Sequence, residues 1–189
     1  DQLFVSGRIN SSWHSFYTDF FGQRANATID TINVWEGLQF DIPNASDCVL
    51  STPASLQGIV VMVTQGASAD GCHLDFSDAN QTAAGLNPVL EVRLAIDNFS
   101  NSDFTIGFSD LAQNSTASTT NNGIFFYISD GDTTWQTVTR SGASHTQQNT
   151  GVTAVANATT TMRIEVDSTA QARFYLGGKL VSTHTSNIP

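Results

Sequence analysis

The stretch that decides the fold covers residues 90–110 and reads LEVRLAIDNFSNSDFTIGFSD. From residue 90 to 96 every second side chain is an aliphatic one, with Glu91, Arg93 and Asp97 on the other face. Such alternation is typical of a half-buried antiparallel strand. It resumes over residues 104–108 after a polar turn at 98–103. We therefore predict a β-hairpin whose acidic residues lie on the solvent-exposed face.

Alternation continues through the second half of the chain. Further strands are predicted at residues 123–129, 134–139, 162–167 and 172–176, with a turn at 129–132. Gly177-Gly178 before residues 179–183 is a two-residue hairpin signal. The polar segments 111–122 and 141–161 are predicted to be surface loops.

The first half is less regular. Residues 38–42 alternate as a short strand, and the nearly continuous apolar run at 56–64 predicts a central strand buried on both faces. About ten short strands without a convincing helix predict an all-β, antiparallel two-sheet sandwich or jelly roll. With 40% hydrophobic content and no break in composition, residues 1–189 are expected to form one domain. The aromatic stretch at 13–21 makes residues 1–35 a candidate extension or contact segment.

Composition excludes some functions. The formal net charge is −10, and only seven Lys and Arg are present, so nucleic acid and anionic membranes are not expected partners. No apolar run approaches the roughly 20 residues of a membrane helix. Cys48 and Cys72 could form a disulfide or remain as two buried thiols.

The chain contains a characteristic series of segments, in the order WHSFYTDFFG, EVRLAI, DFTIGFSD, GIFFYISDGDTTW and TMRIEVDSTAQARFYLGGKLVST. It resembles the concanavalin A-like lectin/glucanase (LamG-like) jelly roll, and more narrowly the modules of tailed-bacteriophage virion proteins. The resemblance covers residues 89–185 well and the first half loosely. Members of this superfamily usually close with a further strand after the glycine hairpin, so we expect an extension or a neighbouring subunit to complete this one.

Hydrolytic members of that superfamily use paired carboxylates. Glu91 and Asp97 are six residues apart on one strand, or roughly 20 Å, which is too far for a glycosidase pair. The α-carbons of Glu165 and Asp167, two residues apart on one strand, are expected about 7 Å apart. The two residues resemble the start of the E-x-D-x-x-E pattern of laminarinase-like glucanases. Ala170 stands where the acid/base glutamate would be, so a solvated charge ladder with Arg163 is the favoured interpretation.

Other catalytic arrangements are not evident. No Gly-x-Ser-x-Gly elbow occurs, and the four histidines are not spaced as a triad or a zinc site. We expect each of them in a loop or at the surface: His14, His73, His145 and His184.

Two turns are candidate ligand sites. Asp130 and Asp132 offer oxygens for Ca²⁺, and Trp135 could stack on a sugar ring. The alternative is an ordinary hairpin turn with Trp135 in the core. A second oxygen-rich turn, in which Asn and Asp also suit the turn backbone, contains Asp97, Asn98, Asn101 and Asp103.

The first hypothesis for function is a non-enzymatic structural or decoration protein on the surface of a phage-like virion. Its partners would be major capsid or fibre subunits and further copies of itself. The alternative is a carbohydrate-binding, lectin-like module of a virion adhesin or a secreted protein, and a glycoside hydrolase is the third hypothesis. No cofactor is expected beyond the Ca²⁺ candidate.

Overall fold

The computed structural model describes residues 87–100, 103–110 and 122–189 in full, and in the earlier part only the backbone of seven short strands. Contacts between α-carbons divide the chain into two compact units, Asp1–Gln81 and Thr82–Pro189. The expectations of one domain and of a contact segment at residues 1–35 stay predictions. No helix in the described part is long and apolar enough to cross a membrane.

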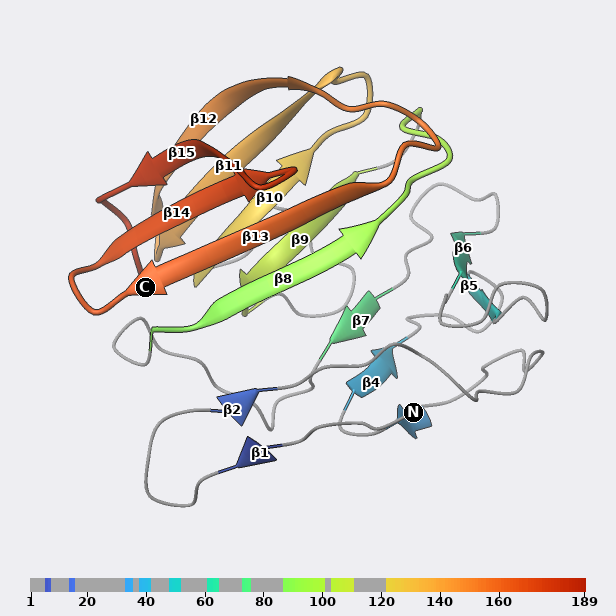
Figure 1. The fold of residues 1–189 in the computed structure, drawn as a ribbon, viewed down its shortest axis with the longest axis horizontal. Coiled ribbons are helices and arrows are strands. Elements are labelled where there is room, and N and C mark those ends of the chain that lie inside the picture. The colour runs from blue at the N-terminus through green and yellow to red at the C-terminus, as the bar shows by residue number, and fades with distance from the viewer. Residues whose placement is uncertain are drawn as a thin grey trace. The chain divides into compact units, whose positions relative to one another are not determined.

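Seven short strands are described in the first unit (Figure 1). β1 (Ser6–Gly7) pairs with β2 (His14–Ser15). A three-stranded sheet consists of β3 (Asn33–Trp35), β4 (Leu38–Asp41) and β7 (His73–Asp75). A second pair consists of β5 (Cys48–Ser51) and β6 (Val61–Thr64). β4 confirms the strand predicted at residues 38–42. β6 covers only the end of the apolar run at 56–64, and the rest of that run lies outside the described residues.

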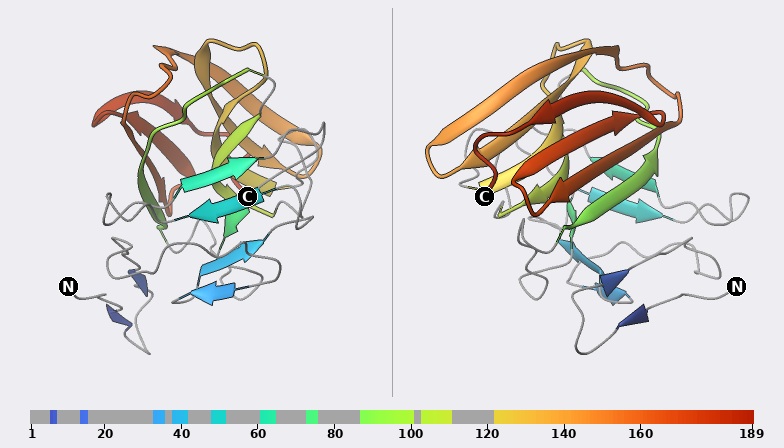
Figure 2. Two further views of the ribbon diagram at one scale, coloured as in Figure 1. Left: turned by 90° about the vertical axis from the view of Figure 1, so that its right-hand side faces the viewer. Right: turned by 60° about the vertical axis from the view of Figure 1, so that its left-hand side comes forward.

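The second unit is a sandwich of two four-stranded antiparallel sheets, which confirms the predicted fold class (Figure 1). We call the sheet with the order β15-β14-β13-β8 the ionic sheet and the sheet with the order β12-β11-β10-β9 the aromatic sheet. The ionic sheet consists of β8 (Val89–Leu94), β13 (Thr160–Asp167), β14 (Gln171–Leu176) and β15 (Lys179–His184). The aromatic sheet consists of β9 (Phe104–Ser109), β10 (Asn122–Ile128), β11 (Thr134–Ser141) and β12 (Ser144–Thr153). Figure 2 shows the two layers from further sides.

The core lies between these sheets because the apolar residues of each strand alternate toward it. Phe126 of β10 and Phe174 of β14 are fully buried and meet edge to face, with ring centroids 5.3 Å apart. Burying a side chain of this size contributes about 1.5–3 kcal/mol. The apolar side chains buried in this cluster are Ile124, Phe126, Ile128, Trp135, Met162, Ile164, Val166, Ala172, Phe174 and Leu176.

The hairpin predicted for residues 90–110 is wrong, although both of its strands exist. β8 pairs with β13 and β9 pairs with β10, so the connection passes from one sheet to the other. Alternation identifies the face of a strand that is buried, and both strands do face the same core. It cannot distinguish a hairpin from a crossing between two sheets that share a core.

The loop predicted for residues 141–161 is also wrong over much of its length, since β12 occupies Ser144–Thr153. This strand begins one tight turn after β11, at Gly142 with a φ of 59°. A polar composition favours a loop, but this strand lies at a sheet edge, where polar side chains are tolerated. Residues 111–121 lie outside the described residues, so the loop predicted at 111–122 stays a prediction over that range.

β10 is buried on both faces, which simple alternation did not predict. Phe125 points away from the core described above and is nevertheless 0% exposed, in a second cluster with Val138 and the half-buried Tyr127. Gly107 lies opposite Phe125 in the ladder. A side chain at Gly107 would collide with the backbone carbonyl of Ile124 and with Phe125, so β9 and β10 approach closely at this point.

Candidate functional site

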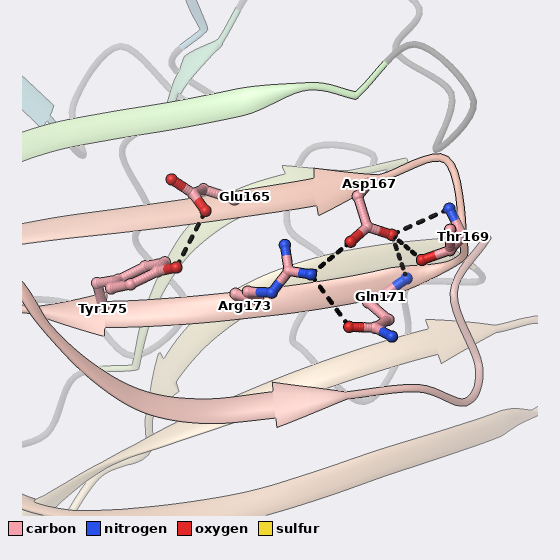
Figure 3. A network of polar contacts seen from close by, with 6 residues as sticks. All are labelled: Glu165, Asp167, Thr169, Gln171, Arg173 and Tyr175. Atoms are coloured by element: carbon pink, nitrogen blue, oxygen red, sulfur yellow. Dashed lines mark hydrogen bonds and ion pairs between the residues drawn. The ribbon is translucent and has the colours of Figure 1, made fainter.

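The sequence-predicted carboxylates lie on the outer face of the ionic sheet, where the ladder brings opposite charges together (Figure 3). Glu165 of β13 is directly opposite Arg173 of β14, and Asp167 is opposite Gln171. On the other side of β13, Arg163 is opposite Glu91 of β8. Side chains at such paired positions share a face, so three strands contribute to one polar surface.

Glu165 has a partner at each carboxylate oxygen. Oε1 lies 2.6 Å from Nη2 of Arg163. Oε2 accepts a hydrogen bond of 3.0 Å from the hydroxyl of Tyr175 (Figure 3). Arg163 also reaches Glu91 at 3.3 Å. Burial, followed by the hydrogen bond to Glu165, raises the pKa of Tyr175. Burial alone lowers the pKa of Arg163, but the hydrogen bonds and charges of Glu165 and Glu91 outweigh it and raise that pKa.

Asp167 closes the tight turn between β13 and β14. Its Oδ1 accepts hydrogen bonds from the Thr169 hydroxyl at 2.5 Å, the Thr169 amide at 3.0 Å and the Gln171 amide at 3.2 Å. Its Oδ2 lies 2.6 Å from Nη2 of Arg173 (Figure 3). These contacts, the Thr169 hydroxyl foremost, lower the pKa of Asp167.

This arrangement favours the charge ladder over a glycosidase pair. A general acid needs a carboxyl whose pKa is raised, so the lowered pKa of Asp167 does not suit this residue to that role. Ala170, at the position of the missing glutamate, is an exposed turn residue with a φ of 57°. Tyr175 and Glu91 belong to the same surface, and sequence reasoning assigned neither to it. Only the pairing of β13 with β8 and β14 reveals them.

Asp130 and Asp132 lie in the turn between β10 and β11, as predicted, and both are exposed. The turn is closed by a hydrogen bond of 2.9 Å from the Asp132 amide to the Ser129 carbonyl. Asp103, which directly precedes β9, braces it, because its Oδ1 accepts from the Ser129 hydroxyl at 3.0 Å and the Asp130 amide at 2.8 Å. Its place before β9 agrees with the turn predicted at 98–103, but its contact with the 129–132 turn has no signal in the sequence.

Trp135 lies in the core, as the alternative interpretation of this turn predicted. It is 3% exposed, belongs to the core, and meets Phe99 edge to face with centroids 6.0 Å apart. An indole buried in this way presents no face on which a sugar ring could stack. Ligand binding by Asp130 and Asp132 stays a prediction.

The second oxygen-rich turn is in part an ordinary Asx turn. Oδ1 of Asn98 accepts a hydrogen bond of 2.9 Å from the Ser100 amide, as such a turn requires. Asp97 is exposed, and Asn101 lies outside the described residues. Within residues 87–100, 103–110 and 122–189, no group of three His, Cys, Asp or Glu side chains could hold a metal ion.

One histidine departs from expectation. His184 is 1% exposed and lies between the sheets, so its prediction as a loop or surface residue is wrong. His145 of β12 is exposed, as predicted. The side chains of His14 and His73, and those of Cys48 and Cys72 with the choice between a disulfide and two thiols, lie outside the described residues.

The family model described as SO2946-like, C-terminal domain, matches residues 57–189. No curated protein and no solved structure matches the chain. The matched segment includes the whole sandwich together with β6 and β7. The chain therefore belongs to the SO2946-like family, through its C-terminal domain.

Proposed function

We propose that the protein is a non-enzymatic structural module, a decoration component on the surface of a phage-like particle. The observation that carries the non-enzymatic part is the state of the two glucanase-like carboxylates. Glu165 is bound by Arg163 and Tyr175, and Asp167 by Arg173 and the turn. Each acid is therefore held in place by a neighbouring cation.

The finer fold assignment is part of this proposal. We infer that the sandwich is a concanavalin A-like jelly roll related to modules of tailed-bacteriophage virion proteins. The two sheets of four antiparallel strands are compatible with that assignment, and the strand segments of residues 89–185 resemble that group. Site residues decide function more strongly than fold does, so the virion assignment needs its own test.

The mechanism of such a module is static. A rigid sandwich would contact capsid or fibre subunits, or a second copy of itself, along a sheet edge. Each sheet of the sandwich has two edge strands with one hydrogen-bonded neighbour each, β8 and β15 in the ionic sheet and β9 and β12 in the aromatic sheet. Val89 at the start of β8 is 53% exposed, which offers apolar surface beside that edge. A virion-surface location follows from this role, and an extracellular one from the alternative below.

The alternative function is carbohydrate binding, for which the turn is exposed but the tryptophan that would stack on a sugar ring is buried. Asp130 and Asp132 remain accessible, whereas Trp135 is buried in the core. Binding on a glycan array that Asp130→Asn with Asp132→Asn abolishes would favour this alternative. No glycan binding by the intact protein would remove it.

The deciding experiment is to purify the protein from its source and determine its mass and native location by cryo-EM. A regular array on a shell or fibre is the expected result, and a free monomer in solution would overturn the structural proposal. A parallel glucanase assay tests the non-enzymatic part. No turnover is expected, and turnover that Glu165→Gln abolishes would contradict it.

A further inference from the structure

His184 connects the two sheets through both of its ring nitrogens. It lies at the end of β15 in the ionic sheet, while its partners Thr137 and Thr139 lie on β11 in the aromatic sheet. Nδ1 is 2.9 Å from the Thr139 hydroxyl and Nε2 is 3.0 Å from the Thr137 hydroxyl. All three side chains are at most 1% exposed. The imidazole also packs on Phe174, with ring centroids 5.1 Å apart.

The two threonine hydroxyls have further acceptors, and this constrains the ring. Thr139 is placed to donate to the Ser186 carbonyl at 3.0 Å, and Thr137 to the Gln148 carbonyl at 3.4 Å. A hydroxyl has one hydrogen to donate, so a threonine that donates to a carbonyl can only accept from the ring. If both threonines do so, both ring nitrogens must carry hydrogen, which makes the ring a cation.

A neutral ring carries one hydrogen, so one threonine must turn its hydrogen toward the ring. The bond of Thr137 to Gln148 is the longer and weaker one and is the one given up. The neutral state therefore has the hydrogen on Nδ1, donated to Thr139, while Thr137 donates to Nε2. This choice of tautomer follows from the two carbonyl distances.

No described charge balances a cation at this position. The ionisable residues on the neighbouring strands are Arg140 on β11, His145 on β12, and Arg173 and Tyr175 on β14, and by alternation they lie on the outward faces. The other ionisable residue of β15 is the exposed Lys179 at its far end. The inward neighbours are Phe174 and polar uncharged side chains. Burial accordingly lowers the pKa of His184 below its ordinary 6.5.

We propose that His184 is a pH-sensitive pin between the sheets, neutral with its hydrogen on Nδ1, and that protonation of this ring loosens the end of β15. The residues after the pin depend on the same contacts. Ser186 accepts from Thr139 and lies 2.9 Å from the Thr146 hydroxyl, which also accepts from Asn187 at 2.9 Å. The cation keeps both ring bonds to the threonines, so what opposes it in the folded state is the burial of its charge, and opening of the end of β15 relieves this by returning the ring to water. Protonation therefore favours an open state in which the segment 184–187 is released from β11 and β12.

The direction of the pH effect follows from linkage. The unfolded chain binds a proton at His184 near pH 6.5, and the folded chain binds it only at lower pH. The stability contributed by the neutral pin is complete above the unfolded value and decreases as the pH falls toward the folded one. Most carboxylates titrate below about pH 5, so the window between about pH 5 and 7 isolates the histidines.

The first test is NMR of the protein labelled with ¹⁵N in histidine. At about pH 7 the expected pattern for His184 is a protonated Nδ1 and an unprotonated Nε2, with a titration midpoint below the ordinary histidine value of 6.5. A hydrogen on Nε2, or a midpoint above 6.5, would overturn the proposal. This measurement needs no variant, so it holds even if changes at His184 prevent folding.

Hydrogen exchange tests the release of β15. Between about pH 7 and 5, after correction for the intrinsic rate, exchange of the amides at 182–186 should accelerate about threefold or more relative to those of β13. His184→Gln should remove this pH dependence and the matched control His145→Gln should keep it. Equal acceleration in both sheets, or its persistence in His184→Gln, would contradict the pin.

Paired variants test the asymmetry of the two threonines. Thr139→Val removes the acceptor of Nδ1 and the donor to Ser186, whereas Thr137→Val removes the donor to Nε2 and the weaker contact to Gln148. Exchange at 184–187 should increase about tenfold or more for Thr139→Val and clearly less for Thr137→Val. The reverse order would contradict the proposal that Thr139 makes the stronger contacts of the pin.

Discussion

The outer faces of the two sheets differ although their sequences alternate alike. On the ionic sheet, the outward positions form an ion-pair surface, with the side chain of Arg163 43% exposed and that of Glu91 56% exposed. On the aromatic sheet, the outward Phe125 and Val138 are 0% and 4% exposed. The ionic face is a solvated surface and the outer face of β10 is a second core. The stability of the sandwich therefore depends on both faces of one sheet and mainly on one face of the other.

Phe125→Ala should have the largest effect among the variants that test this comparison. The change removes a fully buried ring, so we expect a loss of about 3–5 kcal/mol in the free energy of unfolding. Chemical denaturation measures the loss, with Phe126→Ala on the inward face as the matched reference. A loss below about 1 kcal/mol would show that the outer face of β10 is solvated after all.

Gly107→Ala tests the close approach of β9 to β10 beneath that ring. An added Cβ would meet the backbone of Ile124 and Phe125, which cannot move aside without disturbing the ladder. We expect a loss of about 1–3 kcal/mol. Gly123→Ala is the control, because its Cβ would chiefly meet the Phe125 ring, at 2.7 Å, and a ring can shift more easily than a backbone. A smaller loss at Gly107 than at Gly123 would contradict this ranking.

Asp167→Asn tests the ionic face through its pH dependence. The pKa of Asp167 is lowered from 3.8, so its contribution is present above that value and is lost as the pH falls through the folded pKa. The stability difference between wild type and Asp167→Asn should therefore be smaller than the loss for Phe125→Ala and should shrink in acid. Urea unfolding at about pH 6 and about pH 3 measures it. A difference that does not change with pH would mean that the charge of Asp167 is not involved.

Ala170→Gly should have the smallest effect and the opposite sign. Ala170 has a φ of 57°, a conformation that costs an L-residue about 1–2 kcal/mol and glycine almost nothing. Part of this gain is offset by the greater freedom of glycine in the unfolded chain, which leaves a net stabilisation of about 0.5 kcal/mol. Thermal unfolding measures the gain, and Ser168→Gly, in the same turn, is the control. Destabilisation of Ala170→Gly would show that the turn relaxes around alanine.

The candidate site was partly predictable. Glu165, Asp167 and Arg163 are close in sequence on one alternating strand, so their common outward face followed from the period of two. Glu91 and Tyr175 complete the surface from other strands, and no local signal identifies them. His184 was misplaced for a related reason. A histidine near the end of a strand is ordinarily exposed, and its burial depends on two threonines from the opposite sheet.

Local patterns in the sequence predict where most strands of the sandwich run, which of their faces are apolar, and where Gly177-Gly178 turns the chain. These features are local, because the alternation of a strand and the backbone freedom of glycine act within a few residues. Contacts between distant segments determine that β8 pairs with β13, that the polar segment 144–153 is a strand, and that Phe125 is buried. Alternation could not predict these features, because it specifies a buried face and not a partner. Partners are selected when distant strands meet and satisfy each other's backbone hydrogen bonds around a common core.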